Sequence, residues 1–139
     1  MRTEDLDAMK RLGEKAGWEP EAGPLKGVVV AYGCFDRGRM VGCAALQLLD
    51  GEHFLEYVAV ESSMRGRGIG AALVARIEEE ARAAGLKELW AKARLPGFYE
   101  RLGYEVLSET GRGAKSLKGC ESCPQYHVTC TPAMVVRRL

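Results

Sequence analysis

The hydrophobic positions of this chain change their spacing several times, and each spacing predicts a different element. The series begins at residues 6–16, where apolar side chains recur at steps of three and four residues. That spacing places them on one face of an amphipathic helix. Thr3 or Asp5 can cap the start of this helix, and we expect Gly17 to end it.

Three runs rich in valine, leucine and aromatic residues come next and have the composition of strands. We expect these strands at residues 27–35, 40–49 and 53–60. The glycine-containing segments between them, residues 36–39 and 50–51, are typical of tight turns. The pattern therefore predicts an antiparallel meander of three strands.

Helical spacing returns after the third strand. The apolar residues that recur there at steps of four are Ile69, Leu73, Ile77 and Ala81. This spacing stacks them on one face of a second, longer helix. We expect Gly85 to end that helix as its C′ residue. The remaining expectations are a strand at residues 86–93, a short helix at 96–102, strands at 104–107 and 133–137, and a loop at 108–119.

The size and composition of the chain favour a single folded domain over residues 1–139. Of its 139 residues, 47% are hydrophobic and 28% are charged, which is ordinary for a globular protein. A net charge of +1 gives no electrostatic basis for a nucleic-acid or membrane partner. The first residues lack the apolar core of a signal peptide, so we expect a cytoplasmic location. The sequence leaves the oligomeric state open, a homodimer included.

A turn rich in glycine and arginine joins the third strand to the second helix. Its core is Arg-Gly-Arg-Gly-Ile-Gly at residues 65–70. Glycines let the backbone approach a ligand closely, and the first amides of a helix have no partner within the helix. Strand, turn and helix N-terminus together are typical of a phosphate-binding site, to which Arg65 and Arg67 add positive charge. The spacing fits neither a P-loop nor a dinucleotide fingerprint.

Arg65, Gly68 and Gly70 form Arg-x-x-Gly-x-Gly, which resembles motif A of the GNAT superfamily of acyl-CoA-dependent N-acyltransferases. Residues 98–104, Phe-Tyr-Glu-Arg-Leu-Gly-Tyr, resemble a second segment of that family. The resemblance implies an α/β (α+β) fold with a central mixed sheet, an antiparallel meander and flanking helices. It also implies a pair of parallel strands that splay apart, here residues 54–60 and 87–93.

Two features depart from the family pattern. Almost nothing precedes Thr3, so we expect the first family strand to be missing. Arg94 and Leu95 stand where many members carry an asparagine, which puts one cofactor or substrate contact in doubt.

The resemblance implies an N-acetyltransferase that moves an acetyl group from acetyl-CoA to a primary amine, by direct attack in a ternary complex. The low net charge favours a small-molecule acceptor. Two alternatives stay open: a protein N-terminal or lysine acetyltransferase, and a non-catalytic CoA-binding or zinc/thiol sensor module. The residues implied to bind the cofactor are Val58, Ala59 and Val60 for the pantetheine arm, and Arg65, Gly66, Arg67, Gly68, Ile69, Gly70 and Ala71 for the pyrophosphate.

Two side chains are candidates for moving protons. Tyr99 matches the family position that often protonates the departing thiolate, and a phenol with a pKa near ~10 is protonated at neutral pH. Glu56 lies where many members carry a glutamate that accepts the amine proton. The structural alternatives are an aromatic anchor for Tyr99 and a surface carboxylate for Glu56. His53 and His127 are alternative bases.

The five cysteines fall into two groups. Cys34 and Cys43 lie among apolar neighbours and are expected to be small buried residues. A cysteine-rich segment at residues 120–130 has the pattern Cys-x2-Cys-x3-His-x2-Cys. Zinc would accept those ligands, and a redox pair is another reading, but the spacers are shorter than in common zinc sites. We therefore expect reduced thiols and no resident metal. The metal-ligand candidates are Cys120, Cys123, His127 and Cys130.

Overall fold

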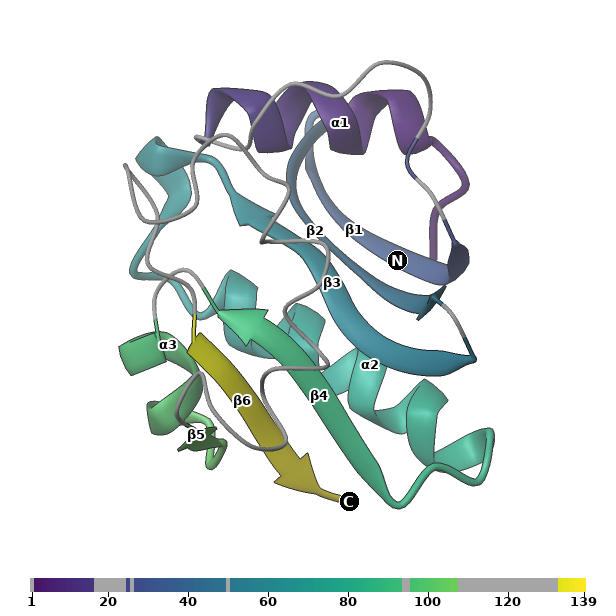
Figure 1. Cartoon of the computed structure of the whole chain (residues 1–139). Coiled ribbons are helices and arrows are strands. Elements are labelled where there is room, and N and C mark those ends of the chain that lie inside the picture. The colour runs from purple at the N-terminus through teal and green to yellow at the C-terminus, as the bar shows by residue number, and fades with distance from the viewer. Residues whose placement is uncertain (1, 17–24, 26, 50, 94–95, 108–132) are drawn as a thin grey trace. The chain divides into compact units, whose positions relative to one another are not determined.

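A computed structural model describes residues 2–16, 25, 27–49, 51–93, 96–107 and 133–139. They divide into two compact units, Met1–Leu86 and Lys87–Leu139 (Figure 1). The single domain expected over the chain stays a prediction. No helix of the described residues is long and apolar enough to cross a membrane.

The first unit is built on the predicted meander. Strands β1 (Val28–Asp36), β2 (Arg39–Leu49) and β3 (Glu52–Val60) pair antiparallel in chain order. Arg37 and Gly38 form the turn between β1 and β2, and both have a positive φ, 52° and 79°. Such a turn matches the right-handed twist of the two strands that it joins.

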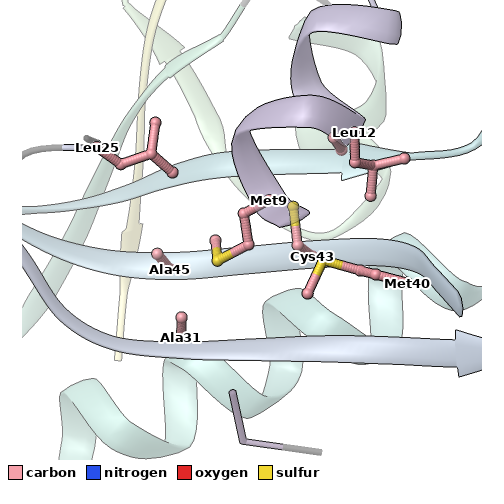
Figure 2. Close-up of a cluster of buried hydrophobic side chains, with 8 residues drawn as sticks. Met9, Leu12, Leu25, Ala31, Met40, Cys43 and Ala45 are labelled. Carbon is pink, nitrogen blue, oxygen red and sulfur yellow. The ribbon is translucent and has the colours of Figure 1, made fainter. Parts of the chain in front are cut away.

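Helix α1 (Leu6–Lys15) covers one face of the meander by packing on β2 and β3 (Figures 1 and 2). The Asp5 carboxylate caps the helix by accepting a hydrogen bond from the Ala8 amide at 3.0 Å. This confirms one of the two expected caps, while the expected stop at Gly17 lies outside the described residues. The cluster under α1 consists of Met9, Leu12, Leu25, Ala31, Met40, Cys43, Ala45 and Ala59.

Helix α2 (Ile69–Ala83) packs on β1, β2 and β3 from the opposite face (Figure 1). Its predicted apolar stripe is confirmed, because Leu73, Ile77 and Ala81 are buried. Gly85 ends the helix with a φ of +84°. The Gly85 amide donates to the Arg82 carbonyl, and the Leu86 amide donates to the Ala81 carbonyl, both at 3.0 Å. These two bonds are those of a Schellman motif.

A polar link joins β1 to α2 across the apolar layer. The Tyr32 side chain is buried, and its hydroxyl donates to a Glu80 carboxylate oxygen at 2.5 Å. The Arg76 guanidinium lies over the Tyr32 ring, 5.0 Å from its centre. The hydrogen bond to Glu80, with burial as a smaller cause, raises the pKa of Tyr32 above its ordinary value.

The segment before α1 also contacts β1. Arg2 forms an isolated antiparallel bridge with Tyr32, and the Thr3 amide donates to the Ala31 carbonyl at 2.9 Å. The described residues ahead of α1 form this bridge and no longer strand, and the absence of the first family strand stays a prediction. The sequence did not predict that this segment would pair with the edge of β1, since two residues carry no periodic pattern.

The second unit contains strands β4 (Glu88–Ala93), β5 (Glu105–Leu107) and β6 (Ala133–Arg138), with β6 paired antiparallel to both others. Helix α3 (Pro96–Arg101) packs against β5 and β6. These elements lie within two residues of their predicted bounds. The two strands expected to splay apart, β3 and β4, belong to different units, and the expected splay stays a prediction.

Candidate functional site

Strand β3 carries an extra residue near its end. Cys43 of β2 pairs with Ala59, but Ala45 pairs with Glu56. Residues 57 and 58 of β3 therefore lie opposite a single residue of β2, Ala44. One of the two, Tyr57, has a φ of +58°. This is a β-bulge with a residue in the left-handed conformation, a feature that bends a strand and redirects the residues after it. No periodic signal in the sequence indicates it.

After the bulge, the backbone amide and carbonyl of Val60 point away from β2. The Glu61 amide donates to the Val41 carbonyl at 2.8 Å, which makes that pair a hydrogen-bonded one. Hydrogen-bonded and non-hydrogen-bonded pairs alternate along an antiparallel ladder. The neighbouring pair of Gly42 and Val60 is therefore of the second kind, with its amides and carbonyls turned outward. The Val60 carbonyl accepts a hydrogen bond from the Arg65 Nε at 3.2 Å.

The predicted glycine-rich turn directly follows this strand end. A short 3-10 helix (Ser62–Met64) leads into it, and Gly66 and Gly68 both have a positive φ, of 81° and 77°. The first i→i−4 bond of α2 runs from the Ala72 amide to the Gly68 carbonyl. The amides of residues 69–71 therefore make no i→i−4 bond within the helix, and they lie at the positive end of the helix dipole.

The predicted phosphate-binding residues share this short stretch. Gly68 is the N-cap of α2 and has no side chain to occupy the amides. Arg65, Gly66, Arg67 and Gly68 are exposed, while Gly70 is buried against the sheet. An anion placed here would meet helix amides and two arginines.

An ion pair anchors the entry to the turn. The Arg39 Nη1 lies 2.7 and 2.6 Å from the two carboxylate oxygens of Glu61. The hydrogen bond from Arg39 holds the pKa of the Glu61 carboxyl below its ordinary value. No local pattern in the sequence indicates this pair, because it joins the start of β2 to the end of β3 and depends on their register.

Gly42 lets the N-terminal end of α2 approach the sheet closely. A Cβ at this position would lie 2.8 Å from the Ile69 Cγ2 and 3.0 Å from the Leu73 Cδ1. The contact with the helix therefore requires glycine at this position. Gly42 also pairs with Val60 of the neighbouring strand β3. Gly42 links the two parts of the candidate site, and no local pattern in the sequence indicates it because the contact is long-range.

The candidate base Glu56 lies on β3 directly before the bulge. It is half-buried, and one carboxylate oxygen accepts from the Tyr57 amide at 3.4 Å. Its partner on β2, Ala45, belongs to the cluster under α1. Since paired residues of an antiparallel ladder share a face, Glu56 lies on the face that α1 covers. The alternative base His53 is half-buried opposite Leu48, and His127 lies outside the described residues.

The candidate acid Tyr99 belongs to α3 in the second unit. Its side chain is buried, and its ring makes edge-to-face contacts with Phe98 and Tyr104, with ring centres 5.1 and 5.5 Å apart. The Tyr99 carbonyl accepts from the amides of Leu102 and Tyr104 at 3.0 Å. These contacts fix the ring firmly, which both a proton donor and an aromatic anchor require.

The cysteines agree only in part with expectation. Cys43 is fully buried, as expected, but Cys34 is half-buried, so that part of the prediction was wrong. Cys34 lies near the end of β1, where the burial of the strand ends. The candidate ligands at residues 120, 123, 127 and 130 lie outside the described residues. Among the residues that the structure does describe, no three His, Cys, Asp or Glu gather as a metal site would need.

The amino-acid sequence matches a known family over most of its length. The model of the Acetyltransferase (GNAT) family matches residues 3–104. Blasticidin-S acetyltransferase of Streptomyces morookaense is 29% identical over 124 residues, which are 86% of this chain and 80% of that protein. An uncharacterised N-acetyltransferase of Chlorobaculum tepidum is 26% identical over 104 residues, which are 74% of this chain and 66% of that protein.

Solved structures share the fold. A Mycobacterium tuberculosis protein in complex with CoA has a TM-score of 0.67 at 20% identity, covering 100% of this chain and 99% of that one. N-acetylglutamate synthase from Neisseria gonorrhoeae, complexed with CoA and N-acetyl-glutamate, has a TM-score of 0.61 at 26% identity. The match covers 75% of this chain but only 24% of that synthase. These likenesses confirm the expected α/β fold class.

Proposed function

The chain belongs to the Acetyltransferase (GNAT) family, and from that premise we propose that it transfers an acetyl group from acetyl-CoA to a primary amine of a small molecule. The enzyme class, an acyl-CoA-dependent acyltransferase, agrees with the family and with the relatives' names. Structural neighbours crystallised with CoA support acetyl-CoA as the co-substrate. The cytoplasmic location expected from the sequence stays a prediction.

The observation that carries the proposal is the continuity of one stretch of backbone. The bulge turns the groups of Val60 away from β2, and the two left-handed glycines and the start of α2 follow within ten residues. The pantetheine arm has amide groups that can pair with an outward-facing strand end. The pyrophosphate is an anion that suits the amides of residues 67–71 and the charges of Arg65 and Arg67.

The chemistry requires one bond to form, one bond to break and two protons to move. The acceptor nitrogen attacks the thioester carbonyl carbon, and we assign to the Val60 amide the stabilisation of the oxyanion that develops. Collapse of this intermediate breaks the carbon–sulfur bond, and the thiolate takes a proton from the Tyr99 hydroxyl. The amine proton goes to Glu56, directly or through water. Direct attack in a ternary complex requires no acetylated enzyme.

A relative supports the choice of a small acceptor. The Streptomyces protein, 29% identical over 86% of this chain, is named for acetylation of blasticidin-S. The net charge of +1 adds no attraction for a polycationic protein tail. The segments expected to bind the acceptor are the first helix with its following loop at residues 18–24, the β1–β2 hairpin and the cysteine-rich segment at residues 120–130. Of these, helix α1 and the hairpin lie within the described residues.

The first test is thermal unfolding with and without acetyl-CoA, with adenosine diphosphate as the control ligand. A ligand at 100 times its Kd adds about 2.7 kcal/mol to the free energy of unfolding. For a chain of this size the unfolding temperature should rise by roughly 5–15 °C. A larger rise with acetyl-CoA than with the nucleotide supports the proposal. The absence of any rise contradicts it.

Two glycine substitutions make this test specific to the turn. Gly68 and Gly38 have almost the same positive φ, 77° and 79°, and a Cβ at either meets nothing within 4 Å. Replacing either by alanine therefore carries a similar backbone cost, about 1–2 kcal/mol. Only Gly68→Ala should weaken CoA binding, because only Gly68 lies in the proposed pyrophosphate site. Equal CoA affinity of the two variants would place the cofactor elsewhere.

The acceptor class is tested by measuring thiol release from acetyl-CoA with a panel of amines. Small amines, including amino acids, polyamines and blasticidin-S, should support turnover at lower concentration than peptides with a free N-terminus or lysine. Preference for the peptides would replace the small-molecule acceptor with a protein one and would leave the acetyl-CoA site intact.

A further inference from the structure

A buried thiol faces the backbone of the bulge. Cys43 is fully buried on β2, in the cluster under α1 (Figure 2). Its thiol donates to the carbonyl oxygen of Tyr57, with the sulfur 3.3 Å from that oxygen. Burial raises the pKa of the Cys43 thiol to about 12. The group is therefore protonated at neutral pH, which makes it a hydrogen-bond donor and a poor nucleophile.

Tyr57 is in a conformation that requires support. Its φ of +58° lies in the left-handed region, which costs a residue with a side chain about 1–2 kcal/mol. Bulky residues persist there only when their surroundings enforce the conformation. A glycine is the residue that normally occupies such a bulge position, so this chain must hold its tyrosine by contacts.

The contacts that hold Tyr57 come from β2. Besides the thiol of Cys43, the amide nitrogen of the Gln47 side chain donates to the Tyr57 hydroxyl at 3.3 Å. Gln47 is buried, and it lies four residues from Cys43, on the same face of β2. The Tyr57 ring packs against the cluster under α1. One strand therefore holds both the backbone and the side chain of the bulged residue.

We propose that Cys43, together with Gln47, is a positioning residue that holds the left-handed bulge and thereby aims the backbone of residues 58–60 at the acyl-CoA. This inference rests on the proposed function, because residues 58–60 are where that function places the pantetheine arm. If β3 lost its bulge, its pairing with β2 would shift by one residue. Such a shift turns the backbone groups and side chains that follow to the opposite side.

Three variants test this role. Cys43→Ala removes the donor, and Cys43→Ser keeps a short side chain with a hydroxyl donor. Cys34→Ala is the control for the loss of a thiol, because Cys34 is half-buried on the neighbouring strand β1 and pairs with Gly42 of β2. The Kd for CoA is measured by titration calorimetry well below each unfolding temperature, so that every variant is folded and a change in stability does not alter the measured Kd.

We expect Cys43→Ala to weaken CoA binding about two- to fivefold, the value of one weak hydrogen bond. Cys43→Ser should bind CoA like the unaltered protein, and so should Cys34→Ala. Tyr57→Phe removes the hydroxyl that Gln47 contacts with little change of volume, and it should also weaken CoA binding. If Cys43→Ala does not fold, the CoA affinity of Tyr57→Phe is the test of the proposal.

A second readout is independent of the ligand. The backbone amide resonances of residues 58–60 should shift in CoA-free Cys43→Ala and return in Cys43→Ser, while a loss of packing alone would leave Ser as perturbed as Ala. Unchanged CoA affinity and unchanged resonances in Cys43→Ala and Tyr57→Phe overturn the positioning role and leave the proposed function standing. If the unaltered protein binds no CoA, the proposed function fails, and the resonances alone then decide whether Cys43 holds the bulge.

Discussion

The contact of Gly42 with helix α2 allows a quantitative test of how the candidate site is built. In Gly42→Ala the new Cβ would lie 2.8 Å from the Ile69 Cγ2 and 3.0 Å from the Leu73 Cδ1. Carbon atoms in contact are normally at least about 3.5 Å apart, so the start of α2 must move away from the sheet by about 0.7 Å. The Ile69 methyl cannot turn aside easily, because β-branched side chains in helices have one preferred rotamer.

The expected loss of stability follows from two opposing effects. Overpacking of a core costs about 1–3 kcal/mol, while replacing a strand glycine by alanine regains about 0.5–1 kcal/mol of backbone entropy. A net loss of about 1–2 kcal/mol lowers the unfolding temperature of a chain of this length by about 3–7 °C. Displacement of the amides at the start of α2 should also weaken CoA binding.

Differential scanning calorimetry of four variants measures this effect: Gly42→Ala, Ile69→Ala, the double variant that combines them, and Gly97→Ala. Gly97→Ala is the control, because a Cβ at Gly97 meets nothing within 4 Å and its φ is not in the positive range. That variant should unfold at the same temperature as the unaltered protein or slightly higher. Adding Ile69→Ala to Gly42→Ala removes the closest methyl, so the double variant should lose less stability than the sum of the single losses. An unchanged or higher unfolding temperature for Gly42→Ala alone would refute the reasoning.

Two further predictions concern tyrosines. Tyr99→Phe should lower kcat at least about tenfold while the Kd for CoA is unchanged, because only the proton donor is lost. Tyr104→Phe, in the same ring cluster, is the control, and an unchanged kcat in Tyr99→Phe would remove Tyr99 from the mechanism. Tyr32→Phe should lower the free energy of unfolding by about 1 kcal/mol at neutral pH, because the hydrogen bond to Glu80 is lost. The pKa of Tyr32 is raised above 10.0 in the folded protein. The bond therefore stabilises below pH 10.0 and this contribution is lost as the pH rises through the folded pKa. The free energies of unfolding of Tyr32→Phe and of the unaltered protein, measured by urea unfolding, should therefore converge at high pH. A difference between them that does not change with pH would contradict this assignment.

Much of the fold could be predicted from the sequence because its elements follow local rules. The meander comes from strand-like runs separated by short turns, and residues 69–83 form a helix whose apolar residues recur at steps of four. The end of that helix at Gly85 follows from the ability of glycine to adopt a positive φ. The pattern of Arg65, Gly68 and Gly70 likewise predicts a helix start, and in the structure these residues lie at the start of α2.

The sequence alone determined which segments are helices and strands, which faces are apolar, and where the glycine-rich turn begins α2, because these depend on residues close together in the chain. Only the tertiary structure decided the details that complete the candidate site. The bulge at Tyr57, its bond from Cys43 and the fit of Gly42 against Ile69 each depend on which residues of separate elements lie opposite one another. That register is set by packing over the whole first unit, and no local spacing encodes it.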